Sequence, residues 1–134
     1  MRTVHLFLTL VRLQACHSIE EFAFRLYDVF PPARFVSGLV SADRARGFLI
    51  INAILLLLGL AFYFGPVRCR WPSSRMFVWP WVVIELVNGI GHPAWSVLQR
   101  GYTPGVVTAV PLLVVAVLLA YQLAADNDFQ ASAT

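Results

Sequence analysis

Three ionisable residues that could do chemistry lie close together in the first apolar stretch of the chain: His17, Glu20 and Glu21. An α-helix has about 3.6 residues per turn, so these side chains would project within about 100° of one another. Imidazole and carboxylate groups bind divalent metals and also transfer protons. Each such group costs a few kcal/mol in lipid. We therefore expect the three residues to face one another, a cavity or a ligand.

A matching set occurs later in the chain, where Glu85, Asn88 and His92 would lie within about 60° of one another on a second helix. Gly89 and Gly91 flank this set, and small residues allow helices to approach closely in membranes. If the two helices are neighbours, both sets share one level near the middle of the bilayer. The predicted site residues are therefore His17, Glu20, Glu21, Glu85, Asn88 and His92.

Other polar residues could also face this site. Gln14 extends the first polar face along its helix, and Asn52 and Thr108 lie in the two remaining apolar segments. Each of them alone would more often be an interhelical hydrogen-bonding contact than a functional group. We treat Gln14, Asn52 and Thr108 as secondary candidates.

The composition predicts the elements that carry these residues. The 134-residue chain is 59% hydrophobic and 13% charged, against roughly 45–50% and 25% in soluble domains. This balance indicates an integral membrane protein, and the length suits one domain over residues 1–134. A helix needs about 20 residues to cross the hydrocarbon core. We predict an all-α bundle of four transmembrane helices, over residues 5–28, 42–65, 77–98 and 104–124.

The charges and cysteines exclude other classes of function. All ten basic residues are Arg, and they are scattered among the ends of the predicted spans rather than gathered in a basic stripe. We therefore expect no nucleic-acid binding. Cys16 and Cys69 lack the spacing of a metal site. The arginines divide almost evenly between the two sides of the predicted bundle, so the orientation of the chain in the membrane stays open.

The chain contains three motifs in order: His17-x-x-Glu20-Glu21, Asn88-x-x-x-His92 and Thr103-Pro104-Gly105-x-x-Thr108. They resemble those of small bacterial integral membrane proteins named for an HXXEE motif. The resemblance implies a multi-pass protein of the plasma membrane with this set of site residues. It points to enzymatic activity or metal binding and supplies no specific reaction.

Several functions fit these residues. A single Zn, Fe or Mn ion held by His17, His92 and one or both of Glu20 and Glu21 could activate water for hydrolysis. Without a metal, the paired carboxylates could act as acid and base on an isoprenoid or another lipid. We expect an enzyme that acts on a lipid-soluble substrate. The alternatives are a proton or metal-ion carrier, since intramembrane ionisable groups also mark ion pathways, and a structural or accessory protein.

The expected partners follow from this location. They are membrane lipids and a lipid-soluble small molecule. Assembly into a homo-oligomer stays open.

Overall fold

The computed structural model describes residues 2–131, and side chains as far as Ala125. Residues 2–131 form helices joined by short connections and contain no strand, which confirms the all-α class. The long helices are α1 (Arg2–Ala23), α4 (Arg44–Phe62), α5 (Ser74–Gln99) and α6 (Val106–Ala131). The short ones are α2 (Leu26–Val29), α3 (Pro31–Val40) and the π-helix η1 (Tyr63–Val67).

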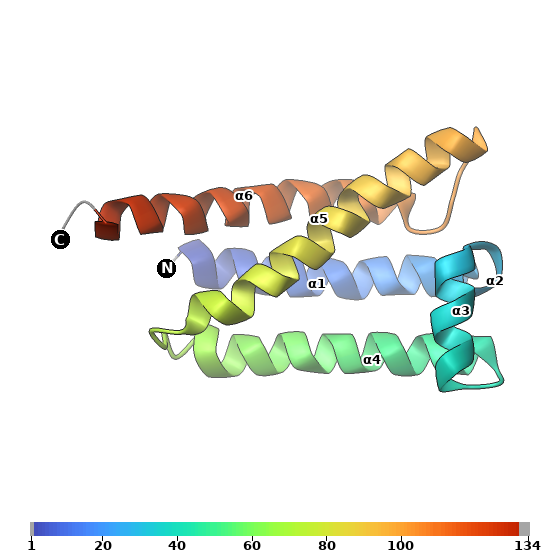
Figure 1. The fold of residues 1–134 in the computed structure, drawn as a ribbon, viewed down its shortest axis with the longest axis horizontal. Helices are drawn as coiled ribbons and strands as arrows, with labels where there is room; N and C mark the ends of the chain where they lie inside the picture. Colours follow the sequence, from blue (N-terminus) through green and yellow to red (C-terminus); the bar gives the residue numbers. More distant parts are fainter. Residues whose placement is uncertain (1, 132–134) are drawn as a thin grey trace.

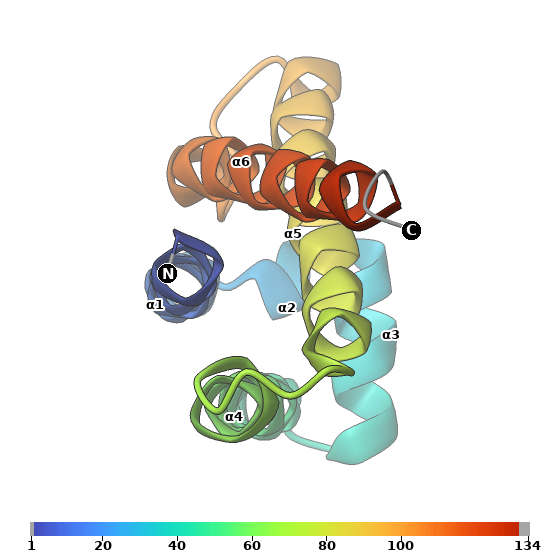
Figure 2. The ribbon, with the colours of Figure 1, turned by 90° about the vertical axis from the view of Figure 1, so that its left-hand side faces the viewer.

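The four long helices form one bundle. Helices α1, α4 and α6 run nearly parallel to a common axis, and α5 crosses them obliquely (Figure 1). Helices α1 and α5 run in one direction along this axis, and α4 and α6 run in the other. The view along the axis shows α1 between α4 and α6, with α5 beside all three (Figure 2). Helices α1 and α5 therefore present their polar faces to the same interior space.

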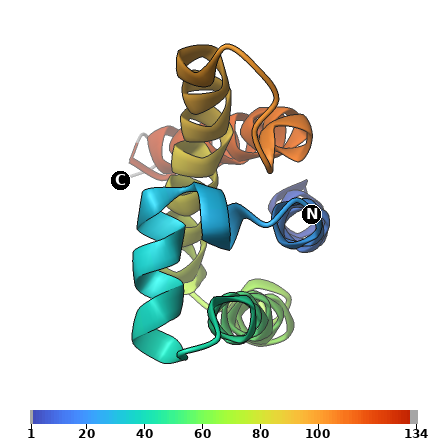
Figure 3. The same ribbon diagram turned by 90° about the vertical axis from the view of Figure 1, so that its right-hand side faces the viewer.

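The first predicted span is shorter than expected and is followed by two unpredicted helices. Helix α1 ends at Ala23, and Arg25 adopts a left-handed conformation with φ 59°. Helix α2 follows, and Pro31 begins α3, where its missing N–H costs no hydrogen bond. Helix α3 lies across one end of the bundle (Figure 3). Its connection to α4 ends at Asp43, whose carboxylate accepts hydrogen bonds from the first backbone N–H groups of α4.

Two apolar clusters enclose the interior polar residues. The larger one joins α1, α5 and α6 around Phe7, Trp81 and Leu112, which are all nearly inaccessible. The smaller one joins α2 and α4 around Tyr27 and Phe48, near α3. The polar residues lie along α1 and α5 between these two clusters.

Two helical segments are long and apolar enough to span a membrane: Arg44–Val67 and Val106–Ala125. Within the described residues, two of the four predicted spans therefore meet this criterion. Helix α1 carries Arg12, Glu20 and Glu21, and α5 carries Glu85, Asn88 and His92 among its apolar residues. The polar residues that suggested a site are the ones that lower the hydropathy of these two helices.

Candidate metal centre

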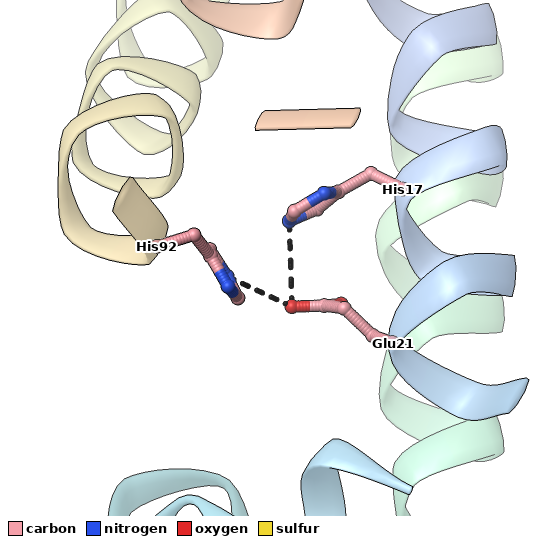
Figure 4. Close-up of side chains that lie close together, drawn as sticks. All are labelled: His17, Glu21 and His92. Atoms are coloured by element: carbon pink, nitrogen blue, oxygen red, sulfur yellow. Dashed lines mark ion pairs between the residues drawn. The ribbon is translucent and has the colours of Figure 1, made fainter. Parts of the chain in front are cut away.

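Three of the predicted site residues meet in the interior of the bundle. His17 and Glu21 lie one turn apart on α1, and His92 reaches them from α5 (Figure 4). The Oε1 atom of Glu21 is 3.3 Å from Nε2 of His17 and 3.1 Å from Nε2 of His92. All three side chains are buried, and the two imidazole rings pack edge to face with centroids 4.7 Å apart. The three residues form a compact set of two imidazoles and one carboxylate.

A chain of hydrogen bonds fixes the protonation of His17. The hydroxyl of Thr108 donates its single proton to Oε2 of Glu20, at 2.6 Å. The same hydroxyl oxygen lies 2.8 Å from Nδ1 of His17 and must therefore accept the proton of that nitrogen. In the neutral imidazole, Nε2 then carries a lone pair. This Nε2 is buried and makes no hydrogen bond in the described part of the chain.

The backbone fixes the protonation of His92 in the same way. Its Nδ1 lies 2.8 Å from the carbonyl oxygen of Pro104, which can only accept a hydrogen bond. Its Nε2 is therefore also a lone-pair donor when the ring is neutral. Two such lone pairs and the carboxylate of Glu21 converge on one point. That arrangement is repulsive unless a positive charge lies between them, supplied by protons on the rings or by a metal ion.

The distances fit a metal ion. Zinc lies about 2.0–2.2 Å from nitrogen and oxygen ligands, so tetrahedral ligands are on the order of 3.4 Å apart. The two distances from Glu21 to the imidazoles match this spacing. One atom from each of the three residues lies within 4.8 Å of the others. Two His and one carboxylate leave the fourth position open, as in catalytic zinc sites.

Glu20 occupies a different position from the other predicted metal ligands. Its two oxygens accept hydrogen bonds from the backbone N–H groups of Val107 and Thr108, in the first turn of α6. They also accept from the hydroxyls of Thr108 and Tyr102. A carboxylate with four donors at a helix N-terminus is well stabilised there. Burial and the adjoining Glu20 carboxylate raise the pKa of Tyr102 to about 12, so its hydroxyl remains a donor. Glu20 therefore holds the hydroxyl of Thr108, which in turn orients His17.

The remaining predicted residues form a second polar set on the same two helices. Glu85 is fully buried, and Nδ2 of Asn88 lies 3.3 Å from it. When the Gln14 amide presents its nitrogen to Glu85, it donates to both carboxylate oxygens at 2.8 and 3.0 Å. Among the described residues, no basic side chain forms an ion pair with Glu85. The set places a buried carboxylate with amide donors on the same two helices as the metal ligands.

Asn52 is tied to this second set through α1. The hydroxyl of Ser18 lies 3.1 Å from the Gln14 amide and donates to Oδ1 of Asn52 at 2.6 Å. Nδ2 of Asn52 donates in turn to the carbonyl of Phe48 within α4. Asn52 therefore joins α4 to α1, and it lies outside the three-residue set. Of the secondary candidates, Thr108 touches a metal ligand directly.

Sequence reasoning assigned no role to the backbone of the connection between α5 and α6. Gly105 has a φ of 90°, and a Cβ on it would lie 2.7 Å from Cε1 and Nδ1 of His92 and 2.9 Å from Cε1 of His17. Only glycine fits this position without displacing both rings. The preceding residue, Pro104, supplies the carbonyl that orients His92. The sequence contained a signal for this turn in the run Thr103-Pro104-Gly105.

The site lies toward one end of the bundle, whereas the sequence predicts a position near its middle. His17 is six residues before the end of α1, about 9 Å along a helix axis. Thr108 is the third residue of α6. In a helix over residues 5–28, the predicted span, His17 would lie near the centre. The earlier end of α1 at Ala23 moves the site toward the connection between α5 and α6.

Comparison of the sequence with family models assigns the chain to a family. A family model described as a protein of unknown function with an HXXEE motif matches residues 8–120. That range contains the three clustered residues together with Glu20, Thr108 and the second polar set. No curated protein and no solved structure matches the chain.

Proposed function

Because the chain belongs to the family of proteins of unknown function with an HXXEE motif, we propose its function from the geometry of the site. The protein is a membrane enzyme that binds one divalent metal through His17, Glu21 and His92 and hydrolyses a lipid-soluble substrate. The observation that carries the proposal is the convergence of two imidazole Nε2 atoms on one carboxylate oxygen. Both Nδ1 atoms are already bound to acceptors.

The ligand set narrows the choice of metal. Two His and one carboxylate with an open position suit zinc, which activates water for hydrolysis at neutral pH when it is bound. The same set also binds Fe(II) and, more weakly, Mn(II). The ligand set contains no sulfur, because Cys16 and Cys69 are both exposed and neither belongs to the buried group of His17, Glu21 and His92. Zinc is our first choice, with iron and manganese as alternatives.

The chain's own residues can hold the substrate and move protons. Glu20 and Thr108 keep Nδ1 of His17 protonated and its Nε2 free, as outer residues do for many metal-bound histidines. Glu85 is buried on the helix that carries His92, with amide donors as its partners, so it can take up and release a proton. We propose Glu85 as the proton acceptor of the reaction. Asn88 is placed to donate a hydrogen bond to a substrate oxygen.

We also propose that all four long helices cross the plasma membrane. The outer face of α5 exposes Val83, Val87 and Ile90, each more than half accessible. Such a surface is stable against lipid, and the polar residues of α5 point inward. In this arrangement α3 lies parallel to the membrane surface, with Phe35 and Leu39 exposed. A lipid-soluble substrate could then reach the site without leaving the bilayer.

A proton or metal-ion carrier is the second candidate. The fully buried Glu85 favours it, because carboxylates without a basic partner inside a membrane often mark ion pathways. An enzyme and a carrier differ in what Glu85→Gln abolishes. If the protein is an enzyme, Glu85→Gln should abolish turnover and leave metal affinity unchanged. If the protein is a carrier, the same substitution should abolish metal-dependent proton flux into liposomes.

Metal binding is tested first, on protein purified in nanodiscs and titrated with Co²⁺ and Zn²⁺. We expect one metal ion per chain, with the visible absorption of tetrahedral Co²⁺ bound to nitrogen and oxygen. His17→Ala, His92→Ala and Glu21→Gln should each lower metal affinity by at least about tenfold. The matched control is His5→Ala, since His5 is exposed near the start of α1. A correctly folded unmutated protein that binds neither metal would overturn the proposal.

A further inference from the structure

We infer that a small pocket beside His92 holds the carbonyl end of a single apolar chain, whose remainder lies in the surrounding lipid. The inference rests on the proposed function and names the class of substrate, an ester or amide of a fatty acid. The pocket has a volume of about 120 Å³. It is lined by Phe30, Val87, Asn88, Gly91, His92 and Trp95.

The pocket is built mainly on one face of α5. Residues 88, 91, 92 and 95 follow the i, i+3, i+4, i+7 spacing that aligns side chains along a helix. His92, a proposed metal ligand, forms part of its wall. The amide of Asn88 also lines the pocket, and, with the Gln14 amide nitrogen facing Glu85, its one hydrogen bond to a described side chain is a long one, of 3.3 Å, to Glu85. A substrate carbonyl in the pocket would therefore meet a hydrogen-bond donor and a metal ligand.

Two aromatic rings line the pocket, and one of them, Trp95, is its lining residue nearest the α5–α6 connection along α5. The rings of Phe30 and Trp95 are in contact, with centroids 4.6 Å apart. At the other end the pocket is bordered by Val87, which is 65% exposed on the apolar outer face of α5. A molecule that enters past Val87 comes from the lipid phase, because the neighbouring exposed residues are Val83 and Ile90. Water-soluble substrates are disfavoured on this route.

The volume limits how much of the substrate fits. The pocket is small, at about 120 Å³, whereas sites that enclose a drug-sized ligand have roughly 300–1,000 Å³. That is enough for a carbonyl group and the first carbons of a chain. The rest of the chain would lie along Val87 and Val83 in the bilayer. The small volume also favours an unbranched chain over the methyl-branched chain of an isoprenoid.

Gly91 keeps the pocket open. A Cβ at this position would meet no heavy atom within 4 Å, so a larger side chain can be accommodated by filling the pocket. Gly91→Leu should therefore block the pocket without disturbing the helix packing. Gly38 in α3 is the matched control, because a Cβ there also meets nothing within 4 Å and the residue does not line the pocket.

The experiment uses hydroxamates, which combine a metal-chelating head with a chosen chain. Protein loaded with Co²⁺ in nanodiscs is titrated with dodecanoyl hydroxamate and with acetohydroxamate, and the visible Co²⁺ spectrum is recorded. We expect Gly91→Leu to weaken the response to dodecanoyl hydroxamate by at least about tenfold. Its Co²⁺ spectrum without the probe should be unchanged, and Gly38→Leu should behave as the unmutated protein. Comparing variants in identical nanodiscs cancels the partitioning of the long chain into lipid.

The outcomes separate the pocket from the metal site. Normal Co²⁺ spectra with equal responses of Gly91→Leu and the unmutated protein would overturn the pocket and leave the metal site standing. A branched isoprenoid hydroxamate that binds better than the straight chain would overturn the substrate class. No Co²⁺ spectrum in the unmutated protein would overturn the proposed function and, with it, the inference.

Discussion

At the residue level, the orientation of His17 depends on the hydroxyl of Thr108, which is not one of the proposed metal ligands. Thr108 accepts from Nδ1 of His17 and donates to Glu20. Thr108→Val keeps the shape of the side chain and removes both hydrogen bonds. We expect metal affinity to fall about 10- to 100-fold, as it does when outer partners of metal-bound histidines are lost. Competition with a chelator of known affinity measures this change.

The conservative variant of the same residue provides the control. Thr108→Ser retains the hydroxyl, so its metal affinity should stay within a fewfold of that of the unmutated protein. The backbone N–H of residue 108 still donates to Glu20 in both variants. If serine and valine weaken binding equally, then the hydroxyl does not orient His17.

Gly105 is the second residue outside the ligand set on which the site depends. In Gly105→Ala the Cβ would lie 2.7 Å from the His92 ring and 2.9 Å from His17, at a φ of 90°. We expect a loss of at least about 1 kcal/mol of stability from the backbone alone. Metal affinity should also fall, because both imidazoles must move. Gly101→Ala is the control, since its Cβ would be 3.9 Å from its nearest neighbour. Calorimetric metal titration and thermal unfolding give the two quantities, and equal behaviour of the two variants would contradict the role of Gly105.

Helical spacing could predict which residues face the interior, because it depends only on local geometry. It could not separate Glu20 from Glu21, since both fall on the face that contains His17. Their different roles depend on α6, whose first turn supplies donors to Glu20 and not to Glu21. The contribution of Pro104 was hidden for a related reason. It is a backbone carbonyl, and its direction follows from the turn and not from the residue type.

At the element level, the ends of helices were the least predictable feature. Helix α1 ends at Ala23, and Arg25 takes the left-handed conformation that glycine usually adopts after a helix. Without a glycine, the sequence offered no stop signal before Pro31. Helix α5 ends in the same manner, with Arg100 at a φ of 53°.

Two glycines of α5, Gly89 and Gly91, test how this helix packs: they are two residues apart, so they lie on nearly opposite faces and have different neighbours. A Cβ at Gly89 would lie 2.6 Å from the Cβ of Leu113 and 2.9 Å from its Cα, on α6. A Cβ at Gly91 meets nothing within 4 Å. Gly89→Ala should therefore destabilise the bundle by about 1–3 kcal/mol, which is typical of overpacking. Gly91→Ala should be neutral or slightly stabilising, since Ala favours helix formation more than Gly does.

Thermal unfolding of both variants in the same detergent provides the measurement. Because both positions lie on α5, the two substitutions should affect membrane insertion and intrinsic helix stability to the same extent. A Gly91→Ala variant that is as unstable as Gly89→Ala would show that α5 and α6 do not approach as closely as the structure indicates.

At the level of the whole molecule, the four-span arrangement predicts which helices lie in lipid. By length and composition the segments Arg44–Val67 and Val106–Ala125 suffice to span a membrane. On α1 and α5 the side chains of His17, Glu21, Glu85 and His92 are buried, whereas Arg12 of α1 is exposed. The two cysteines report on this directly. Cys16 is exposed on the outer face of α1, next to His17 in sequence, and Cys69 is exposed in the connection between η1 and α5.

Labelling of these two cysteines in sealed vesicles distinguishes four spans from two. With a membrane-impermeant maleimide, we expect Cys69 to react from one side of the membrane and Cys16 to react from neither. The reason is that a thiol in the hydrocarbon region is shielded from water and from the reagent. Cys16→Ser and Cys69→Ser assign each signal, and denaturing detergent should make both thiols reactive. Equal labelling of Cys16 and Cys69 in intact vesicles would place α1 in water, and the substrate route through lipid would then lose its basis.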